Sequence, residues 1–498
     1  MEITFTTSAL SAVEADTLAV LVPQYEKLTD PRLKALDKAS HGRLQSLLKA
    51  GEFSGREGQI ARFHGIDGYG AANVVVAGLG PKPGVTPDSY RRACGLLSRH
   101  PSLTKYPSAA MFLGPSGDAG LYEAAVEGLI LGSFRILDYR CEETPPSGKL
   151  PAHLAFVLDN KRSVARLQKA VERGRLLAEG QCRVRRLAAT PANLLTPRDM
   201  ARSAQRLARG HPKMSCRIMD ETGIRRERMG ALMAVAQGSE QPPRFVVLEY
   251  RGGRPKQRPV VLVGKGMTYD SGGLSLKKAD TMPEMKGDMT GAAVVMTAIE
   301  CAAQLNLPLN VVALMPLAEN MPSSKAYRPG DIVTSRKGLT IEVMNTDAEG
   351  RLILADALDY ANEFEPQAVI DIATLTGGAL YVLGYSGAPI MGNHPKLMDR
   401  LRAASAATSE RVWEMPIWDD FRGRMKSPLA DLQNSGGKAA ATMTAAAFLE
   451  SFIGDWPWAH VDIAYVDLEP KGRPYIPKGN TGIGLRLLVQ MLIDWKKL

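Results

Sequence analysis

The sequence has few cysteines, no long apolar run and no basic leader at its start. Its five cysteines are an odd number without CxxC spacing, which favours reduced, buried thiols and predicts a cytoplasmic protein. No run approaches the roughly 20 apolar residues of a membrane span, so we expect no membrane partner. The first residues lack the basic region of a secretory signal.

The chain is long enough for several domains, since 498 residues with 45% apolar content supply two or three large cores. Residues 1–165 alternate short β-rich runs with helical stretches, which predicts a small N-terminal α/β domain with an assembly or regulatory role. A long helix predicted over Arg162–Arg186 lies mostly in a helical linker, residues 166–200. In residues 201–498, alternating apolar and helical runs predict a catalytic α/β/α domain around a mixed, mostly parallel sheet.

Positive charge is concentrated in the middle of the chain. Between Lys161 and Arg258 there are 23 basic and 8 acidic residues, a surplus larger than the net charge of +10 for the whole chain. Arginine at this density can bind phosphates through counterion release, so DNA is one candidate partner. The alternative is that these arginines form a solvated helix face or pair across subunits. The lack of interleaved aromatic residues favours this alternative over DNA binding.

Four carboxylates occur where loops meet predicted helices and strands in the second half of the chain. They are Asp270, Asp288, Asp347 and Glu349. Ligand sites in open α/β sheets lie at the carboxyl ends of strands, and no His or Cys occurs in these segments. Four carboxylates balance two divalent cations, and oxygen ligands suit Mg²⁺, Mn²⁺ or Zn²⁺. Lys265 is then either an ion-pair partner or a neutral amine ligand.

Two other interpretations of these carboxylates remain open. Thr346-x-x-Glu349 before an apolar run matches a capping box, which would make both side chains structural. A two-metal phosphatase or nuclease would also use a set of carboxylates of this kind.

Several motifs together resemble the leucyl aminopeptidase (cytosol aminopeptidase) family of two-metal exopeptidases. The octapeptide from Asn345 to Leu352 is similar to the signature of that family. Val263–Gly273, Tyr327–Asp331 and Ala373–Gly377 resemble further motifs of the family and follow in the same order. The resemblance covers roughly residues 180–498.

The resemblance implies a metal-dependent aminopeptidase that removes N-terminal Leu and other, mostly apolar, residues from peptides by a metal-bridged hydroxide. It implies two divalent ions per subunit, Mn²⁺, Zn²⁺ or Mg²⁺, at two adjoining sites. One site would consist of Asp270, Asp347 and Glu349, and the other of Lys265, Asp270, Asp288 and Glu349. The two implied catalytic residues are Lys277, which would polarise the scissile carbonyl, and Arg351, which would hold a bicarbonate that acts as the base.

The resemblance also implies a pocket for the N-terminal side chain of the substrate. Its implied lining is Met285, Thr374, Gly377, Ala464 and Asp467. Asp467 departs from the small or apolar residues that are usual in the family, so it could shift preference towards Lys or Arg. An ion pair with Lys471 or Arg473 is the favoured alternative. The family further implies a homohexamer with active sites facing an interior cavity, and some of its members bind DNA.

Overall fold

The computed structural model describes residues 1–115, 117–141 and 149–497. The chain forms two compact units, the first from Met1–Glu179 with Lys471–Lys478 and the second from Gly180–Pro470 with Gly479–Leu498. Both contain sheets with helices, so the predicted α/β class is confirmed. The predicted linker spans the division, because α6 (Val164–Ala189) runs through it. Its boundaries at residues 166 and 200 stay a prediction.

The first unit contains a six-stranded sheet in the order β1-β6-β5-β2-β4-β3. The strands are β1 (Glu2–Thr6), β6 (His153–Val157), β5 (Ser108–Phe112), β2 (Thr17–Val22), β4 (Asn73–Gly78) and β3 (Ile60–His64). All neighbours are parallel except β3 and β4. β2 and β4 are buried along their whole length, as expected for parallel strands with both faces covered.

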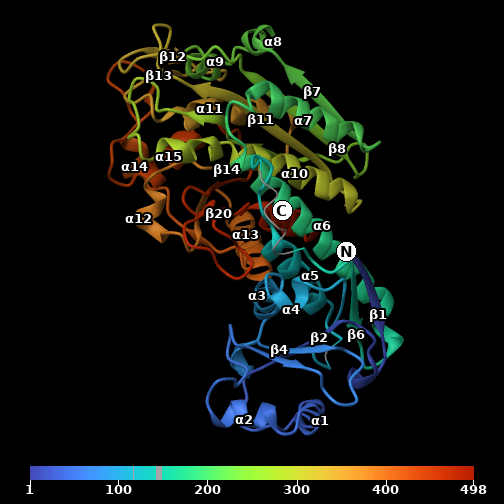
Figure 1. Ribbon diagram of the computed structural model, residues 1–498. Coiled ribbons are helices and arrows are strands. Elements are labelled where there is room, and N and C mark those ends of the chain that lie inside the picture. The colour runs from blue at the N-terminus through green and yellow to red at the C-terminus, as the bar shows by residue number, and fades with distance from the viewer. Residues whose placement is uncertain (116, 142–148, 498) are drawn as a thin grey trace. The chain divides into compact units, whose positions relative to one another are not determined.

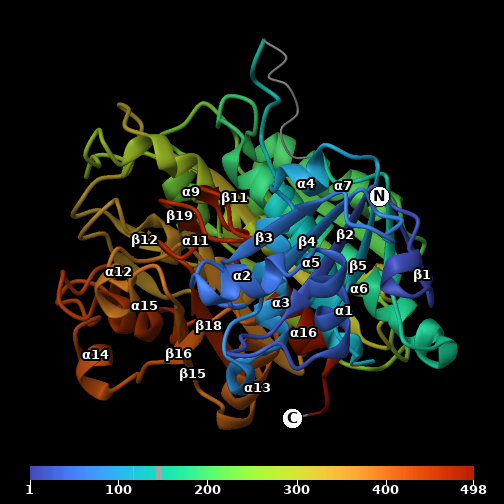
Figure 2. The same cartoon turned by 60° about the horizontal axis from the view of Figure 1, so that its bottom comes forward.

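Helices cover both faces of this sheet, and Figure 1 shows α1 and α2 on one side and α3, α4 and α5 on the other. Their bounds are α1 (Pro31–Ala39), α2 (Arg43–Lys49), α3 (Pro87–Leu97), α4 (Pro101–Thr104) and α5 (Ala119–Ser133). Figure 2 brings α1 and α2 forward. Successive residues of β2 enter opposite cores: Leu18 and Val20 belong to one cluster, Ala19 and Leu21 to the other.

The second unit is built on a nine-stranded mixed sheet. Its strands in spatial order are β16 (Val412–Glu414), β15 (Ala388–Gly392), β18 (Trp458–Asp462), β14 (Ala368–Ala373), β9 (Val260–Gly264), β11 (Asn310–Asn320), β8 (Arg244–Arg251) and β7 (Met214–Met219). The ninth strand, β10 (Gly266–Asp270), pairs in parallel with β11. The four central strands from β18 to β11 are parallel, whereas β15 with β18, β11 with β8 and β8 with β7 are antiparallel.

Helices pack on both faces of the larger sheet as well. One group is α9 (Gly230–Ala236), α11 (Glu349–Tyr360) and α15 (Ala441–Glu450), and the other is α7 (Pro197–Arg209), α10 (Thr290–Gln304), α13 (Pro395–Thr408) and α16 (Leu485–Ile493). α10 and α11 are almost wholly buried, because each packs against both the sheet and a further helix. Shorter elements are α8 (Glu221–Arg226), α12 (Ala379–Leu383), α14 (Asp419–Gly423), β12 (Ile332–Thr334), β13 (Thr340–Glu342), β17 (Leu432–Gln433), β19 (Leu468–Glu469) and β20 (Gly479–Asn480).

Parallel pairing brings distant loops of the second unit to one edge of its sheet. β9, β10, β11, β14 and β18 all end at that edge, and Asp270 pairs directly with Asn320 at the ends of β10 and β11. This is the place where open α/β sheets bind ligands. No helix in the described part of the chain is long and apolar enough to cross a membrane.

Candidate active site

The predicted metal ligands lie at the carboxyl edge of the second unit's sheet or at neighbouring helix starts. Lys265 follows β9 directly, and Asp270 is the last residue of β10. Asp288 follows the short helix η4 (Met282–Gly287) and precedes α10. Glu349 is the first residue of α11, and Asp347 lies two residues before it. The structure thus brings together residues that are separated by more than 80 positions in the sequence.

Two ammonium groups pair with the four carboxylates. Lys265 Nζ lies 2.8 Å from Asp288 Oδ1 and 2.9 Å from Glu349 Oε1. Lys277 Nζ lies 2.8 Å from Asp270 Oδ2 and 2.5 Å from Asp347 Oδ1. Lys265 is buried, whereas the Lys277 side chain is 18% exposed. Two lysine cations, which differ in their access to solvent, thus balance half of the four carboxylate charges.

The pKa values show that this cluster attracts further positive charge. Burial raises the pKa of Asp288 to about 8 and that of Asp347 to about 6, against the opposing effects of Lys265 and Lys277. Burial acts on Glu349 in the same direction, but the two lysines outweigh it and lower its pKa. Burial disfavours both ammonium groups, yet the surrounding carboxylates hold the pKa of each lysine above its usual range.

Neutral donors hold the carboxylates in place. The Gly272 amide and Asn320 Nδ2 both donate to Asp270 Oδ1 at 2.9 Å. Asn320 Nδ2 also donates to the Thr346 carbonyl at 2.9 Å, which ties the end of β11 to the loop before α11. Thr374 Oγ1 donates to Asp288 Oδ1 at 2.6 Å, and the Thr374 carbonyl accepts from Lys265 Nζ. Asn320 is not among the site residues predicted from sequence, although its place at the end of a buried strand marks it as a candidate.

The capping-box interpretation of Thr346 and Glu349 is wrong. The residue that caps α11 is Ala348, whose side chain makes no capping hydrogen bond. The Thr346 hydroxyl instead donates to the Gly272 carbonyl at 2.6 Å and accepts from the Ser275 amide at 2.7 Å. Thr346 thus bonds to the loop of Gly272 and Ser275 and makes no capping bond to α11. Glu349 pairs with Lys265.

Gly350, between Glu349 and Arg351, is required by close packing. A Cβ at this position would lie 2.5 Å from Lys265 Cε and 2.8 Å from Lys265 Nζ. Only glycine therefore lets α11 approach the lysine closely enough for its ion pair with Glu349.

The residues present fit a bound divalent metal. Asp270, Asp347 and Glu349 each offer an oxygen within 4.8 Å of the others. Asp288 Oδ2 is buried and has no hydrogen-bond partner among the described residues. Because a buried carboxylate oxygen without a donor is costly, a cation would satisfy it. Oxygen-rich donor sets of this kind suit hard divalent ions.

Arg351 lies one residue further along the first turn of α11. Its side chain is buried, with Nη1 donating to the Asn434 carbonyl at 2.8 Å and Nε lacking a described partner. Burial lowers the pKa of Arg351 to about 10, so the guanidinium is still charged at neutral pH. Arg351 is therefore a charged side chain whose Nε–H has no acceptor among the described residues.

The residues predicted to line a pocket come from three segments near this cluster. Met285 lies in η4, Thr374 and Gly377 follow β14, and Ala464 and Asp467 follow β18. A Cβ at Gly377 would meet no atom within 4 Å, so there is open space at this glycine.

Asp467 is buried, with an exposed fraction of 9%. Burial raises the pKa of Asp467 to about 7, and the nearby charge of Glu284 adds to this. The predicted ion pair of Asp467 with Lys471 or Arg473 stays a prediction.

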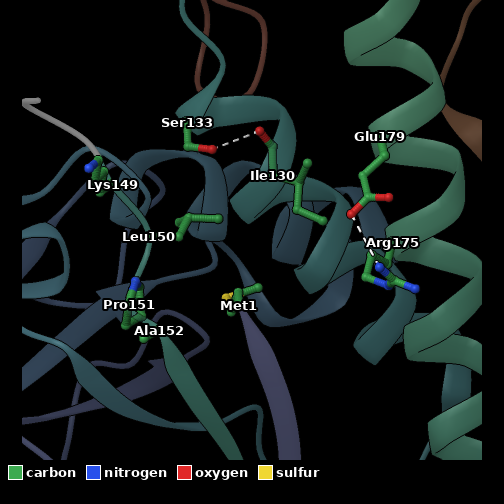
Figure 3. A pocket seen from close by; sticks show the side chains of 9 residues that line it. All are labelled: Met1, Ile130, Ser133, Lys149, Leu150, Pro151, Ala152, Arg175 and Glu179. Carbon is green, nitrogen blue, oxygen red and sulfur yellow. Dashed lines mark hydrogen bonds and ion pairs between the residues drawn. The ribbon is translucent and has the colours of Figure 1, made fainter.

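No predicted site residue lies in the first unit. A hollow of about 470 Å³ there is lined by Met1, Ile130, Ser133, Lys149, Leu150, Pro151, Ala152, Arg175 and Glu179. Figure 3 shows Arg175 and Glu179 projecting from α6, paired with each other at 3.5 Å. Among the described residues no metal-type carboxylate cluster is found in this unit.

Together, the mixed sheet and a cluster of carboxylates and lysines at its carboxyl edge define an α/β protein whose acidic cluster could hold a divalent ion, as the carboxylate clusters of metal-dependent hydrolases do. Residues 182–489 match the family described as "Cytosol aminopeptidase family, catalytic domain", and residues 19–143 match its N-terminal domain. The chain belongs to the cytosol aminopeptidase family and is a peptidase. The resemblance seen in the sequence is thereby confirmed.

Curated relatives match over nearly the whole chain. A probable cytosol aminopeptidase of Syntrophotalea carbinolica is 44% identical over 492 residues, covering 97% of this chain and 98% of the relative. One of Geobacter sulfurreducens is 42% identical over 470 residues, covering 93% and 94%. These relatives support aminopeptidase activity.

Two solved structures share the fold. A tomato leucine aminopeptidase mutant has a TM-score of 0.89 at 29% identity and covers 99% of this chain and 97% of its own. The bottromycin maturation enzyme BotP in complex with Mn has a TM-score of 0.83 at 32% identity, covering 96% and 99%. The predicted two-domain architecture is therefore confirmed.

Proposed function

We propose that this aminopeptidase depends on two divalent metal ions and removes mostly apolar N-terminal residues, Leu among them, from peptides. The observation that carries the proposal is the buried cluster of four carboxylates and two lysines, with an unpartnered oxygen on Asp288. Charge balance supports it, since two divalent cations and four carboxylates cancel. The relative crystallised with Mn is consistent with such ions.

We assign one metal to Asp270, Asp347 and Glu349, and the other to Lys265, Asp270, Asp288 and Glu349. When bound, these ions, Mn²⁺ or Zn²⁺ or else Mg²⁺, supply Lewis acidity and a water of lowered pKa. Lys265 would belong to the second set as a neutral amine, with its proton released to solvent when the dication binds among the same carboxylates.

Lys277 is the cation that we assign to the scissile carbonyl. It is the more exposed of the two lysines, so it is the one that a substrate can reach. An ammonium aimed at a developing oxyanion in a site without water contributes about 3–4 kcal/mol to the transition state.

Arg351 is the group that we assign to hold a bicarbonate, which would supply a base for the proton of the attacking water. Its Nε is buried and free of described partners, and it lies in the same helical turn as Glu349.

The N-terminal side chain of the substrate occupies the pocket of Met285, Thr374, Gly377, Ala464 and Asp467. A Cβ at Gly377 would meet no atom within 4 Å, which leaves room for a substrate side chain beside it. Asp467, with its pKa raised to about 7 by burial, is partly neutral at neutral pH and so tolerates an apolar side chain. In its charged form it favours Lys or Arg, and Asp467→Ala tests this through the Lys-to-Leu ratio of kcat/KM.

The test of the main proposal uses metal-stripped protein with Leu-p-nitroanilide and its N-acetylated counterpart. Mn²⁺ and Zn²⁺, each titrated separately, should restore cleavage of the free-amine substrate only. Glu349→Gln should abolish the recovery, whereas the matched exposed variant Glu365→Gln should keep it. Recovery in Glu349→Gln, or activity that persists in a strong chelator, would refute metal dependence. A phosphate ester as a parallel substrate tests the phosphatase alternative.

We further propose the homohexamer and the cytoplasmic location that the family implies. Light scattering coupled to size exclusion tests the assembly. A mass near the chain's 53.8 kDa would refute it.

DNA binding is a second candidate function, carried by the exposed basic residues of α7 and α8 and the ends of these helices. They include Arg198, Arg209, Arg225, Arg226 and Arg228. These helices pack against β7, the edge strand of the large sheet (Figure 1). Basic residues also protect sheet edges from pairing, which is the alternative account of this surface. A salt-sensitive DNA shift that survives Asp347→Asn would establish DNA binding, and no shift at low salt would refute it.

A further inference from the structure

Tyr465, just beyond the predicted pocket residue Ala464, has a backbone conformation that residues with a side chain avoid. Its φ is +68°, in the left-handed region. Glycine reaches this region without strain, whereas a bulky residue there is an outlier that the surrounding structure must hold in place. Backbone strain of this kind is found most often at functional sites.

The loop that carries Tyr465 is tied to the metal-type cluster by hydrogen bonds. Asp462 Oδ1 accepts from the Ala464 amide and from the Leu375 amide, both at 3.1 Å, and Thr376 Oγ1 donates to Asp462 Oδ2 at 2.6 Å. The loop of Leu375 and Thr376 also contains Thr374, which contacts Asp288 and Lys265. Tyr465 is therefore positioned by the same loops as the cluster.

Two further tyrosines lie beside Tyr465. The rings of Tyr385 and Tyr465 meet edge to face, with centroids 6.2 Å apart and planes at 81°. Tyr381 of α12 is 89% exposed and Tyr385 is 39% exposed. Burial raises the pKa of Tyr465, Tyr385 and Tyr381 add to the effect, and Lys277 opposes it, so the hydroxyl lies in the field of that ammonium.

We propose that Tyr465, braced by Tyr385, is a specificity-determining residue that packs against an aromatic side chain at the second position of the peptide substrate. The proposal deepens the aminopeptidase function and rests on it. The N-terminal side chain fills the pocket at Ala464 and Asp467, which are buried. Lys277, which we assign to the scissile carbonyl, is 18% exposed, and its charge acts on the Tyr465 hydroxyl. The half-exposed ring of Tyr465 and the exposed ring of Tyr385 therefore offer aromatic surface to the part of the substrate that would extend past Lys277 into solvent.

The experiment compares Leu-Phe with Leu-Gly, which share the N-terminal residue and differ only at the second. In the metal-loaded wild type, kcat/KM should favour Leu-Phe. An aromatic contact accounts for about three- to tenfold of that preference, so Tyr465→Gly should reduce it by this factor. Tyr465→Phe, which keeps the ring, should retain the preference. Tyr385→Leu should reduce it by less.

The variant Tyr465→Gly suits the backbone, since glycine adopts a φ of +68° without strain, so it should fold. Ser409→Gly, at a φ of +60° in a loop after α13, is the matched control for relief of strain. It should leave the Leu-Phe to Leu-Gly ratio unchanged.

Two outcomes of this comparison would overturn the proposal. These are an unchanged ratio of Leu-Phe to Leu-Gly in Tyr465→Gly, or a lost preference in Tyr465→Phe. Failure of the proposed function is separable, because calorimetric binding of both dipeptides is measured alongside turnover. Wild-type protein that cleaves neither dipeptide yet binds Leu-Phe more tightly, with the difference lost in Tyr465→Gly, would refute the function and keep the aromatic contact. Equal binding without cleavage would refute both.

Discussion

Asn320 holds the candidate active site together from the end of β11, and its replacement by alanine gives a quantitative test. The side chain is fully buried, and its Nδ2 donates to Asp270 Oδ1 and to the Thr346 carbonyl. Neither acceptor is orphaned in Asn320→Ala, since Asp270 Oδ1 keeps the Gly272 amide and the Thr346 carbonyl keeps the Tyr327 hydroxyl at 2.7 Å. The loss of stability should therefore be only about 1–3 kcal/mol.

The effect on metal binding should be larger than this modest loss suggests. Asp270 belongs to both proposed metal sites, and Asn320 and Gly272 are the neutral donors that orient it. Removing a residue that orients a metal ligand lowers affinity about ten- to hundredfold. Calorimetric titration of the metal-stripped protein with Mn²⁺ measures that change, and thermal unfolding of the same sample measures stability. Asn193→Ala, at an exposed asparagine, is the control.

Two results would refute this reasoning. If Asn320→Ala bound Mn²⁺ as tightly as the wild type, Asp270 would be oriented by the metal itself. If the variant lost more than about 5 kcal/mol of unfolding free energy, Asn320 would be chiefly a packing residue. The second donors to Asp270 and to the Thr346 carbonyl would then not compensate for its loss.

Three further predictions follow from the charges and packing of the site. Burial raises the pKa of Asp467 to about 7, so this carboxyl loses its proton as the pH rises from about 6 to about 8, and the Arg-to-Leu ratio of kcat/KM should rise with it. Asp467→Asn should make this ratio independent of pH. Burial raises the pKa of Asp288 from 3.8 to about 8 on folding. Between these pH values Asp288 holds its proton in the folded metal-free protein but not in the unfolded chain. The free energy of unfolding should therefore fall as the pH rises. Thermal unfolding in a chelator should show that fall, reduced in Asp288→Asn; a slope equal in both proteins would contradict it. Gly350→Ala should displace Lys265 and reduce kcat/KM by at least about tenfold with the fold retained by circular dichroism, and full activity would show that α11 can shift at no cost.

Local sequence patterns predict those helices and strands whose structure depends mainly on their own residues. Val260–Val263 forms β9 because an apolar run without polar interruption suits a strand buried on both faces. Thr290–Gln304 forms α10, and the apolar residues of this segment recur at helical spacing. Thr346 shows the limit of such reasoning. Its spacing from Glu349 matched a cap, but a loop more than 70 residues earlier offered its hydroxyl better partners.

The sequence by itself determined which chemical groups this protein has for its site, because carboxylates, lysines and glycines at the ends of strands are local features. It also determined the α/β class, through the alternation of apolar and helical runs. Only the tertiary structure decided which groups meet. The pairing of Lys265 with Asp288 and Glu349, and the use of Asn320 to orient Asp270, depend on the spatial order of parallel strands. That order is set by packing between distant segments, which no local pattern encodes.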